Sequence, residues 1–140
     1  MSTKATISRR NPDFLPKHRY LELVHLCLQY DDMIAEHGAL LQTSVRAVQI
    51  REGPGGSAPG KSPTEENAIR AAELSKRIDA VRRCAYAAAG PRMAPRLIRN
   101  VTKGKPYDVI QAEEGEPLPI SNRQFYRQRR RFFWLLDKEV

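Results

Sequence analysis

The chain has 140 residues, with 24 Lys and Arg against 16 Asp and Glu, which gives a formal net charge of +8. Its hydrophobic fraction of 41% supports one modest core and is too small for an enzyme fold of several layers. No stretch approaches the roughly 20 apolar residues that span a bilayer, and the N-terminus lacks the apolar segment of a secretory signal. We therefore expect a cytoplasmic protein with no membrane association and with a polyanionic partner.

The first sixty residues divide into three predicted segments. Residues 1–16 carry Pro12 and Pro16 and few apolar positions, which predicts a flexible basic arm. Residues 17–50 form an N-terminal helical region, with a kink or division expected at Gly38. Its apolar positions recur at steps of mostly three and four residues: Tyr20, Val24, Cys27, Tyr30, Ile34, Leu41, Val45 and Val48.

A linker rich in Gly, Pro and Ser is predicted over residues 51–62. Ser62 and Glu65 then form a capping box around Pro63 at the first helical position, so a long helix should begin there and end before Gly90 and Pro91. The expected apolar stripe of this helix consists of Ile69, Ala72, Ile78, Val81, Ala85 and Ala88. The two cysteines, Cys27 and Cys84, lie among apolar neighbours with no paired spacing, which favours buried thiols over a disulfide or a zinc site.

Three further helices are expected in the last fifty residues. The first spans 91–103, with Leu97, Ile98 and Val101 on its buried side, and the second spans 106–112, with Tyr107, Val109 and Ile110. The third runs over 121–139 and begins with a second capping box, Ser121 and Gln124. No segment alternates as a strand does, so the predicted fold class is all-α, with residues 63–140 as a C-terminal helical region.

The final helix has two faces of different chemistry. Phe125, Phe132 and Leu136, with Leu135 beside them, predict a buried stripe. Five arginines and no acidic residue lie between Ser121 and Arg131, whereas a merely solvated helix usually mixes both signs. Asn, Gln and Arg side chains can hydrogen-bond base edges in the major groove, and a helix N-terminus favours phosphate. The pattern therefore favours nucleic-acid binding, with the two short helices ahead as the support of a helix-turn-helix over about 91–139.

The layout resembles the phage late transcription regulators of the RinA and ArpU type, whose C-terminal half is similar to the helix-turn-helix of sigma-factor region 4. The resemblance covers about residues 17–139 and rests most on ISNRQFYRQRRRFF, residues 120–133. It implies DNA-facing positions for Ser121, Asn122, Arg123, Gln124, Tyr126, Arg127 and Arg130, and Arg131 belongs to the same basic cluster. Ten residues separate Ile110 from Ser121, more than the three or four of a compact turn.

Two other patterns in the sequence suggest functions other than DNA binding. Residues 55–62, GGSAPGKS, satisfy the phosphate-loop motif, but no buried strand precedes them and Pro63 removes a backbone amide beside Ser62. His18 and His25 lie two helical turns apart and do not converge on one metal ion without a third ligand. We therefore expect neither a cofactor nor a metal, and a P-loop nucleotide-binding protein is a remote alternative.

The sequence thus predicts a non-enzymatic, DNA-binding regulator of transcription of phage or prophage origin, acting in a bacterial host cell on double-stranded DNA. By analogy alone, the N-terminal helices would contact RNA polymerase or a second copy of the chain. The alternative is a viral packaging or architectural protein that binds DNA without sequence preference.

Overall fold

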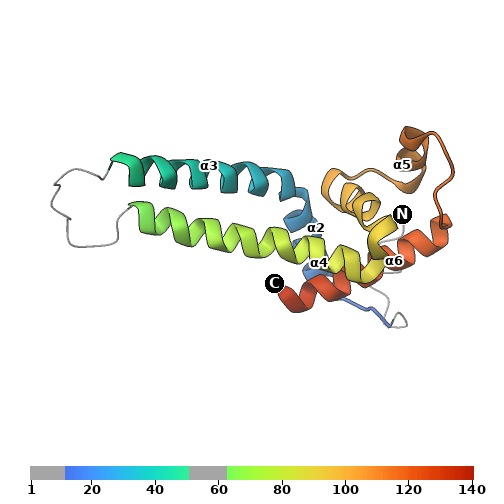
Figure 1. The fold of residues 1–140 in the computed structure, drawn as a ribbon. Helices are drawn as coiled ribbons and strands as arrows, with labels where there is room; N and C mark the ends of the chain where they lie inside the picture. Colours follow the sequence, from blue (N-terminus) through green and yellow to red (C-terminus); the bar gives the residue numbers. More distant parts are fainter. Residues whose placement is uncertain (1–11, 51–62) are drawn as a thin grey trace. The chain divides into compact units, whose positions relative to one another are not determined.

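The computed structural model describes residues 12–50 and 63–140, with side chains described for 12–43 and 64–140. These residues form helices and no strand, which confirms the all-α class for this part of the chain. The helices are α2 (Lys17–Leu28), α3 (Tyr30–Ile50), α4 (Pro63–Lys103), α5 (Tyr107–Glu114) and α6 (Asn122–Glu139) (Figure 1). The predicted linker, including the phosphate-loop pattern and the Ser62 cap, lies outside the described residues.

The chain divides into two compact units. Unit 1 combines the residues up to Tyr30 with Asp79–Val140, and unit 2 is Asp31–Ile78. Helix α4 therefore contributes its first sixteen residues to unit 2 and the remainder to unit 1. This division separates α2 from α3, which sequence periodicity had placed in one N-terminal region.

Unit 1 has an aromatic core built around α6. Phe125, Phe132 and Phe133 are fully buried, and α6 packs against both α2 and α5. The ring of Tyr20 on α2 meets Phe133 edge to face with centroids 5.3 Å apart. Leu15 is also buried. The prediction of a flexible arm over residues 1–16 is therefore wrong for its last residues, because the Leu15 side chain packs in the core.

The N-terminal helical region breaks at Gln29 and continues without interruption through Gly38. Gln29 closes α2 with backbone hydrogen bonds to carbonyls in the last turn, and α3 begins at the next residue. The prediction of a kink at Gly38 is therefore wrong. A glycine lowers helix propensity by about 1 kcal/mol relative to alanine, which the neighbouring helical turns can offset.

The predicted interruption at Gly90 is confirmed. Gly90 has φ +76°, a left-handed conformation that interrupts the helical geometry inside α4. Residues with a Cβ rarely adopt this conformation, so glycine is suited to the position. Pro91 then restarts the helix at a place where its missing N–H costs little. Leu97 and Val101 on this second part are buried, as expected, and Gly104 follows its end with φ +68°.

Unit 2 contains two antiparallel helical segments, residues 31–50 of α3 and 63–78 of α4 (Figure 1). Among the described side chains of this unit, the buried apolar ones are Met33, Ala71, Leu74 and Ile78. The expected stripe is wrong at Ile69, which is 50% exposed, and at Ala72, which is also exposed. The buried stripe of α4 instead consists of Ala71, Leu74 and Ile78. A pair of helices buries only the narrow strip where the two helices touch.

Candidate nucleic-acid interface

Helix α6 begins with the predicted capping box. The Ser121 hydroxyl accepts a hydrogen bond from the Gln124 backbone N–H at 3.2 Å, and the Ser121 N–H donates to Gln124 Oε1 at 3.0 Å. Both side chains remain exposed, as do Asn122 and Arg123 beside them. Capping uses the oxygen of the Gln124 amide, whose nitrogen carries two further donors. The first turn of α6 is thus a fixed, solvent-facing and polar helix start.

Three arginines form the exposed ridge of α6, which we call the arginine face: Arg123, Arg127 and Arg130. At 3.6 residues per turn they fall within about 60° of one another around the helix axis. Arg123 and Arg127 are exposed and Arg130 is half-buried, and none of the three forms an ion pair with another described residue. They lie opposite the buried stripe of Phe125, Phe132 and Leu136. The predicted separation of the two faces is therefore present.

Two of the expected DNA-facing residues are engaged within the protein. Tyr126 is half-buried: its hydroxyl accepts a hydrogen bond from the Tyr107 backbone N–H at 3.3 Å, and its ring packs edge-on against Phe125. Arg131 is exposed but pairs with Asp13 at 3.0 Å and stacks over the Trp134 ring. The structure thus directs Tyr126 towards α5, and it supplies Arg131 with a carboxylate from the segment ahead of α2.

The fifth arginine of the cluster, Arg129, is buried in the core of unit 1 and lies outside the arginine face. Its Nε donates to Asn100 Oδ1 at 2.9 Å, and its Nη1 donates to the Tyr20 hydroxyl at 2.8 Å. The guanidinium also lies 4.8 Å from the centroid of the Phe133 ring. These contacts tie α6 to α2 and α4, so this arginine fixes the position of the helix that carries the arginine face.

Helix α5 and the connection after it are held in place by specific hydrogen bonds. Gly115 ends α5 in a left-handed conformation, φ +73°. Leu118 is buried, and its N–H donates to the side-chain oxygen of Gln111. The Tyr107 hydroxyl donates to the Ile120 carbonyl at 2.6 Å, one residue before the α6 cap. The connection, longer than a compact turn, is therefore structured, and its course sets where α6 begins.

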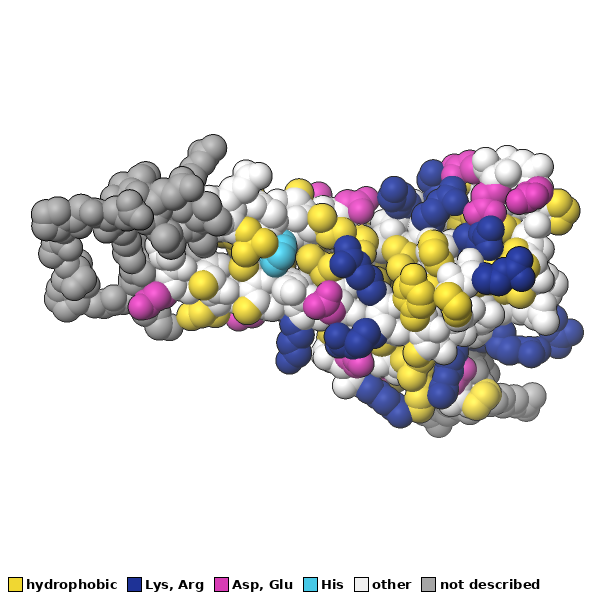
Figure 2. Space-filling model, in the orientation of Figure 1, with side chains coloured by type: hydrophobic (Ala, Val, Ile, Leu, Met, Phe, Trp, Pro, Cys, Tyr) yellow, Lys and Arg dark blue, Asp and Glu magenta, His cyan; other side chains and the backbone are white. Residues whose placement is uncertain are grey.

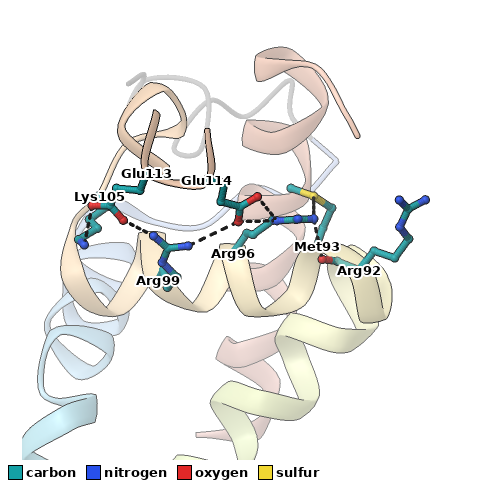
Figure 3. Close-up of polar contacts among 7 residues, drawn as sticks. All are labelled: Arg92, Met93, Arg96, Arg99, Lys105, Glu113 and Glu114. Atoms are coloured by element: carbon teal, nitrogen blue, oxygen red, sulfur yellow. Dashed lines mark hydrogen bonds and ion pairs between the residues drawn. The ribbon is translucent and has the colours of Figure 1, made fainter. Parts of the chain in front are cut away.

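An ion-pair network joins the second part of α4 to the end of α5 (Figure 3). Arg96 Nε lies 2.8 Å from the Glu114 carboxylate, and Arg99 pairs with both Glu113 and Glu114. Lys105 Nζ lies 2.7 Å from Glu113. Glu113 and Glu114 are thus bound by cations of α4 and the α4–α5 loop, while the arginine face has no such partner among the described residues.

This network predicts a pH dependence of stability. The hydrogen bond from Lys105 lowers the pKa of Glu113, and the hydrogen bond from Arg96 lowers the pKa of Glu114, both below the ordinary value of 4.5. A carboxyl group with a lowered folded-state pKa contributes stability above its unfolded-state pKa and loses it as the pH falls through the folded value. Removing both carboxylates should therefore flatten the loss of stability in acid.

We expect Glu113→Gln/Glu114→Gln to be less stable than the wild type at neutral pH, with the difference shrinking below pH 4.5. Urea denaturation at a series of pH values measures this. Because Glu113 is exposed and Glu114 is only half-buried, solvent screens both carboxylates and the neutral-pH difference should be small. Parallel stability curves for the two proteins across the whole pH range would contradict the assignment.

Both cysteines are free and buried, as the sequence predicts. Burial raises the pKa of the Cys27 thiol to about 12 and that of the Cys84 thiol to about 11. A thiol rather than a thiolate is thus present at neutral pH in both places. No group of three or more metal-ligating side chains occurs within residues 12–43 and 64–140. In the described part of the chain, no helix has an apolar stretch long enough to cross a bilayer.

Comparison with known proteins adds no assignment. No protein family, curated protein or solved structure matches the chain. The side chains of α6 and the helices that position them are therefore the basis for inferring a function.

Proposed function

We propose that the protein is a DNA-binding regulator of transcription that places the N-terminal half of α6 in the major groove of double-stranded DNA. The observation that carries the proposal is the arginine face: three arginines on one ridge, opposite a phenylalanine core, without a carboxylate partner among the described residues. A ridge of uncompensated guanidinium groups attracts phosphate, because each contact releases condensed counterions from the duplex.

The first turn of α6 supplies the groups that would read sequence. Asn122 and Arg123 are exposed beside the Ser121 cap, and their side chains match the donors and acceptors that base edges present in the major groove. The helix N-terminus adds a partial positive charge near the same place. Arg127 and Arg130, further along the helix, would contact phosphates and hold the register.

The helices ahead of α6 support a helix-turn-helix role. The second part of α4 and the whole of α5 are joined by the Arg96–Glu114 and Arg99–Glu113 pairs, and α5 packs against α6. In helix-turn-helix proteins the preceding helix braces the recognition helix and crosses the DNA backbone. The resemblance to the RinA and ArpU type also implies a helix-turn-helix. We therefore propose that α5 and α6 are arranged as in the helix-turn-helix of sigma-factor region 4.

The test is a titration of labelled duplex DNA with wild-type protein and with Arg127→Ala/Arg130→Ala. If both side chains contact phosphate, the slope of log K against log salt should fall by about 2, with affinity at low salt reduced by about tenfold or more. Arg77→Ala is a matched control, because Arg77 is an exposed arginine of unit 2 with no ion pair among the described residues. Unchanged affinity of the double variant, with helicity intact, would overturn the proposed face.

Selection of bound duplexes from a random pool tests the regulatory part of the proposal. A regulator should yield a consensus and prefer it over random DNA by roughly 10³ or more. DNA binding that depends on the arginine face but gives no consensus would instead assign the protein to packaging or DNA architecture. If a consensus is found, substitutions of Asn122 and Arg123 should alter it, because these side chains would contact bases. Substitution of Arg127 should weaken binding to all DNA sites alike, because it would contact phosphate.

A further inference from the structure

Basic side chains of unit 1 extend beyond the arginine face. Figure 2 shows many of them over the helices of this unit on the face in view. On α6, Lys138 is the exposed cation outside the arginine face that has no ion pair with another described residue. Several other cations of the unit are already paired with its carboxylates: Arg19, Arg83, Arg96, Arg99, Lys105 and Arg131.

Lys138 lies on the exposed side of α6, in line with the arginine face. At 3.6 residues per turn and 1.5 Å per residue, it falls about 20° from Arg127 around the helix axis and about 17 Å further along this axis. The two acidic residues beside it, Asp137 and Glu139, are paired with arginines of α2 and α4. The exposed side of α6 therefore carries unpaired cations from its first turn to its last.

The ring of Trp134 holds the end of the Lys138 side chain. The Lys138 ammonium group lies 3.3 Å from the ring centroid, and the Arg131 guanidinium lies 4.3 Å from the same centroid. Tryptophan has the strongest attraction of the aromatic side chains for a cation over its ring. Arg131 also has the Asp13 carboxylate at 3.0 Å, whereas Lys138 has no carboxylate partner among the described residues. Because a free lysine samples many rotamers, contact with the ring reduces the entropy that Lys138 loses when it binds an anion.

The length of α6 brings this cation to the DNA backbone when the first turn of the helix enters the major groove. Helix α6 has 18 residues, which is about 27 Å, whereas the major groove is about 12 Å wide. In helix-turn-helix proteins the N-terminal residues of the recognition helix contact the bases. The later turns of such a helix therefore leave the floor of the groove and pass the phosphates at its edge. Lys138 belongs to the last turn of α6.

We propose that Lys138 contacts a DNA phosphate beyond the arginine face, and that Trp134 is a positioning residue that holds the ammonium group in place for this contact. The contact rests on the proposed DNA binding by α6 and extends it from the first half of the helix to its end. An ammonium group has three N–H donors, so it can face the ring and still donate to a phosphate oxygen. Phosphate contacts carry no sequence information directly, so Lys138 contributes to affinity for every duplex.

The first test is a titration of labelled duplex DNA with wild-type protein and with Lys138→Gln at a series of salt concentrations. The substitution should lower the slope of log K against log salt by about 1 and weaken binding severalfold, on all DNA sequences alike. Lys76→Gln is the matched control, because Lys76 is an exposed lysine of unit 2 with no ion pair among the described residues. A slope of Lys138→Gln equal to that of the wild type would overturn the proposal.

A double-mutant cycle tests the positioning role of Trp134. Trp134→Leu should weaken DNA binding about threefold, the equivalent of a cation–π contact at an exposed site, and Trp134→Phe should bind more tightly than Trp134→Leu because it keeps an aromatic face. Trp134→Leu/Lys138→Gln should bind nearly as tightly as Lys138→Gln alone, because the ring acts through the ammonium group. Additive losses in the double variant would contradict the positioning role, since a general effect of Trp134 on folding does not depend on Lys138.

The arginine-face variant Arg127→Ala/Arg130→Ala, measured in the same titrations, separates the two proposals. A lower slope in this variant but not in Lys138→Gln would leave DNA binding by the arginine face in place and show that the contact of Lys138 is wrong. A wild type that does not bind DNA would overturn both. A lower slope in both variants supports a contact with DNA along the whole exposed side of α6.

Discussion

Replacing Arg129 by alanine is expected to lower the free energy of unfolding by about 3 kcal/mol. The guanidinium is buried and donates to Asn100 Oδ1 and to the Tyr20 hydroxyl, so its removal leaves two core acceptors without their donor. It also removes the contact with the Phe133 ring and opens space among the helices. Urea denaturation followed by circular dichroism measures the loss.

The matched variant for this prediction is Arg127→Ala. Arg127 lies two residues earlier on α6, is exposed and has no ion pair within the described residues, so its replacement should change stability by no more than about 0.5 kcal/mol. The two substitutions should therefore separate two roles of one helix: Arg129→Ala impairs folding, and Arg127→Ala impairs DNA binding. Equal stability of both variants would show that the buried hydrogen bonds contribute nothing net.

Replacing Phe132 by alanine is expected to cost about 3–5 kcal/mol of stability, the range found for large-to-small substitutions of buried aromatic residues. Phe132 is fully buried and meets Phe133 edge to face with centroids 5.0 Å apart. Its loss creates a cavity in the centre of unit 1, which the packed helices can close only in part. The midpoint of urea denaturation should fall accordingly.

Tyr86→Ala is the control for this aromatic truncation, because Tyr86 lies on α4 of the same unit and is 50% exposed. Its replacement should leave stability within about 0.5 kcal/mol of the wild type. A Phe132→Ala protein that unfolds at the wild-type midpoint would show that α6 does not have the packing described above.

Much of α6 could be predicted from the sequence, because helix caps and apolar periodicity are local signals. The Ser121–Gln124 box and the burial of Phe125, Phe132 and Leu136 are confirmed. The burial of Arg129 was missed, although its spacing carried a signal: it lies four residues after Phe125 and three before Phe132. An arginine is usually a surface residue, but the position of Arg129 on the helix places it in the core. There its guanidinium donates hydrogen bonds to the Tyr20 hydroxyl and to the Asn100 side-chain oxygen.

The parts that were missed depend on contacts between distant segments. The N-terminal region divides at Gln29, and α2 on one side of this break packs against α6, which is distant in sequence. The ion pair of Arg131 with Asp13 likewise joins two segments that are far apart in the chain, and no local sequence pattern predicts it. In unit 2 the apolar residues of α4 are numerous enough to define two stripes, and only the position of α3 decides which one is buried.

The single tryptophan of the chain, Trp134, offers an optical consequence of this architecture. It lies on α6 between Arg131 and Lys138, whose charged groups are 4.3 and 3.3 Å from its ring centroid. Because unit 2 contains no tryptophan, indole emission follows the melting of unit 1 alone, whereas far-ultraviolet dichroism follows the helices of both units. Overlaying the two melting curves therefore reveals whether the units unfold as one cooperative body or in succession.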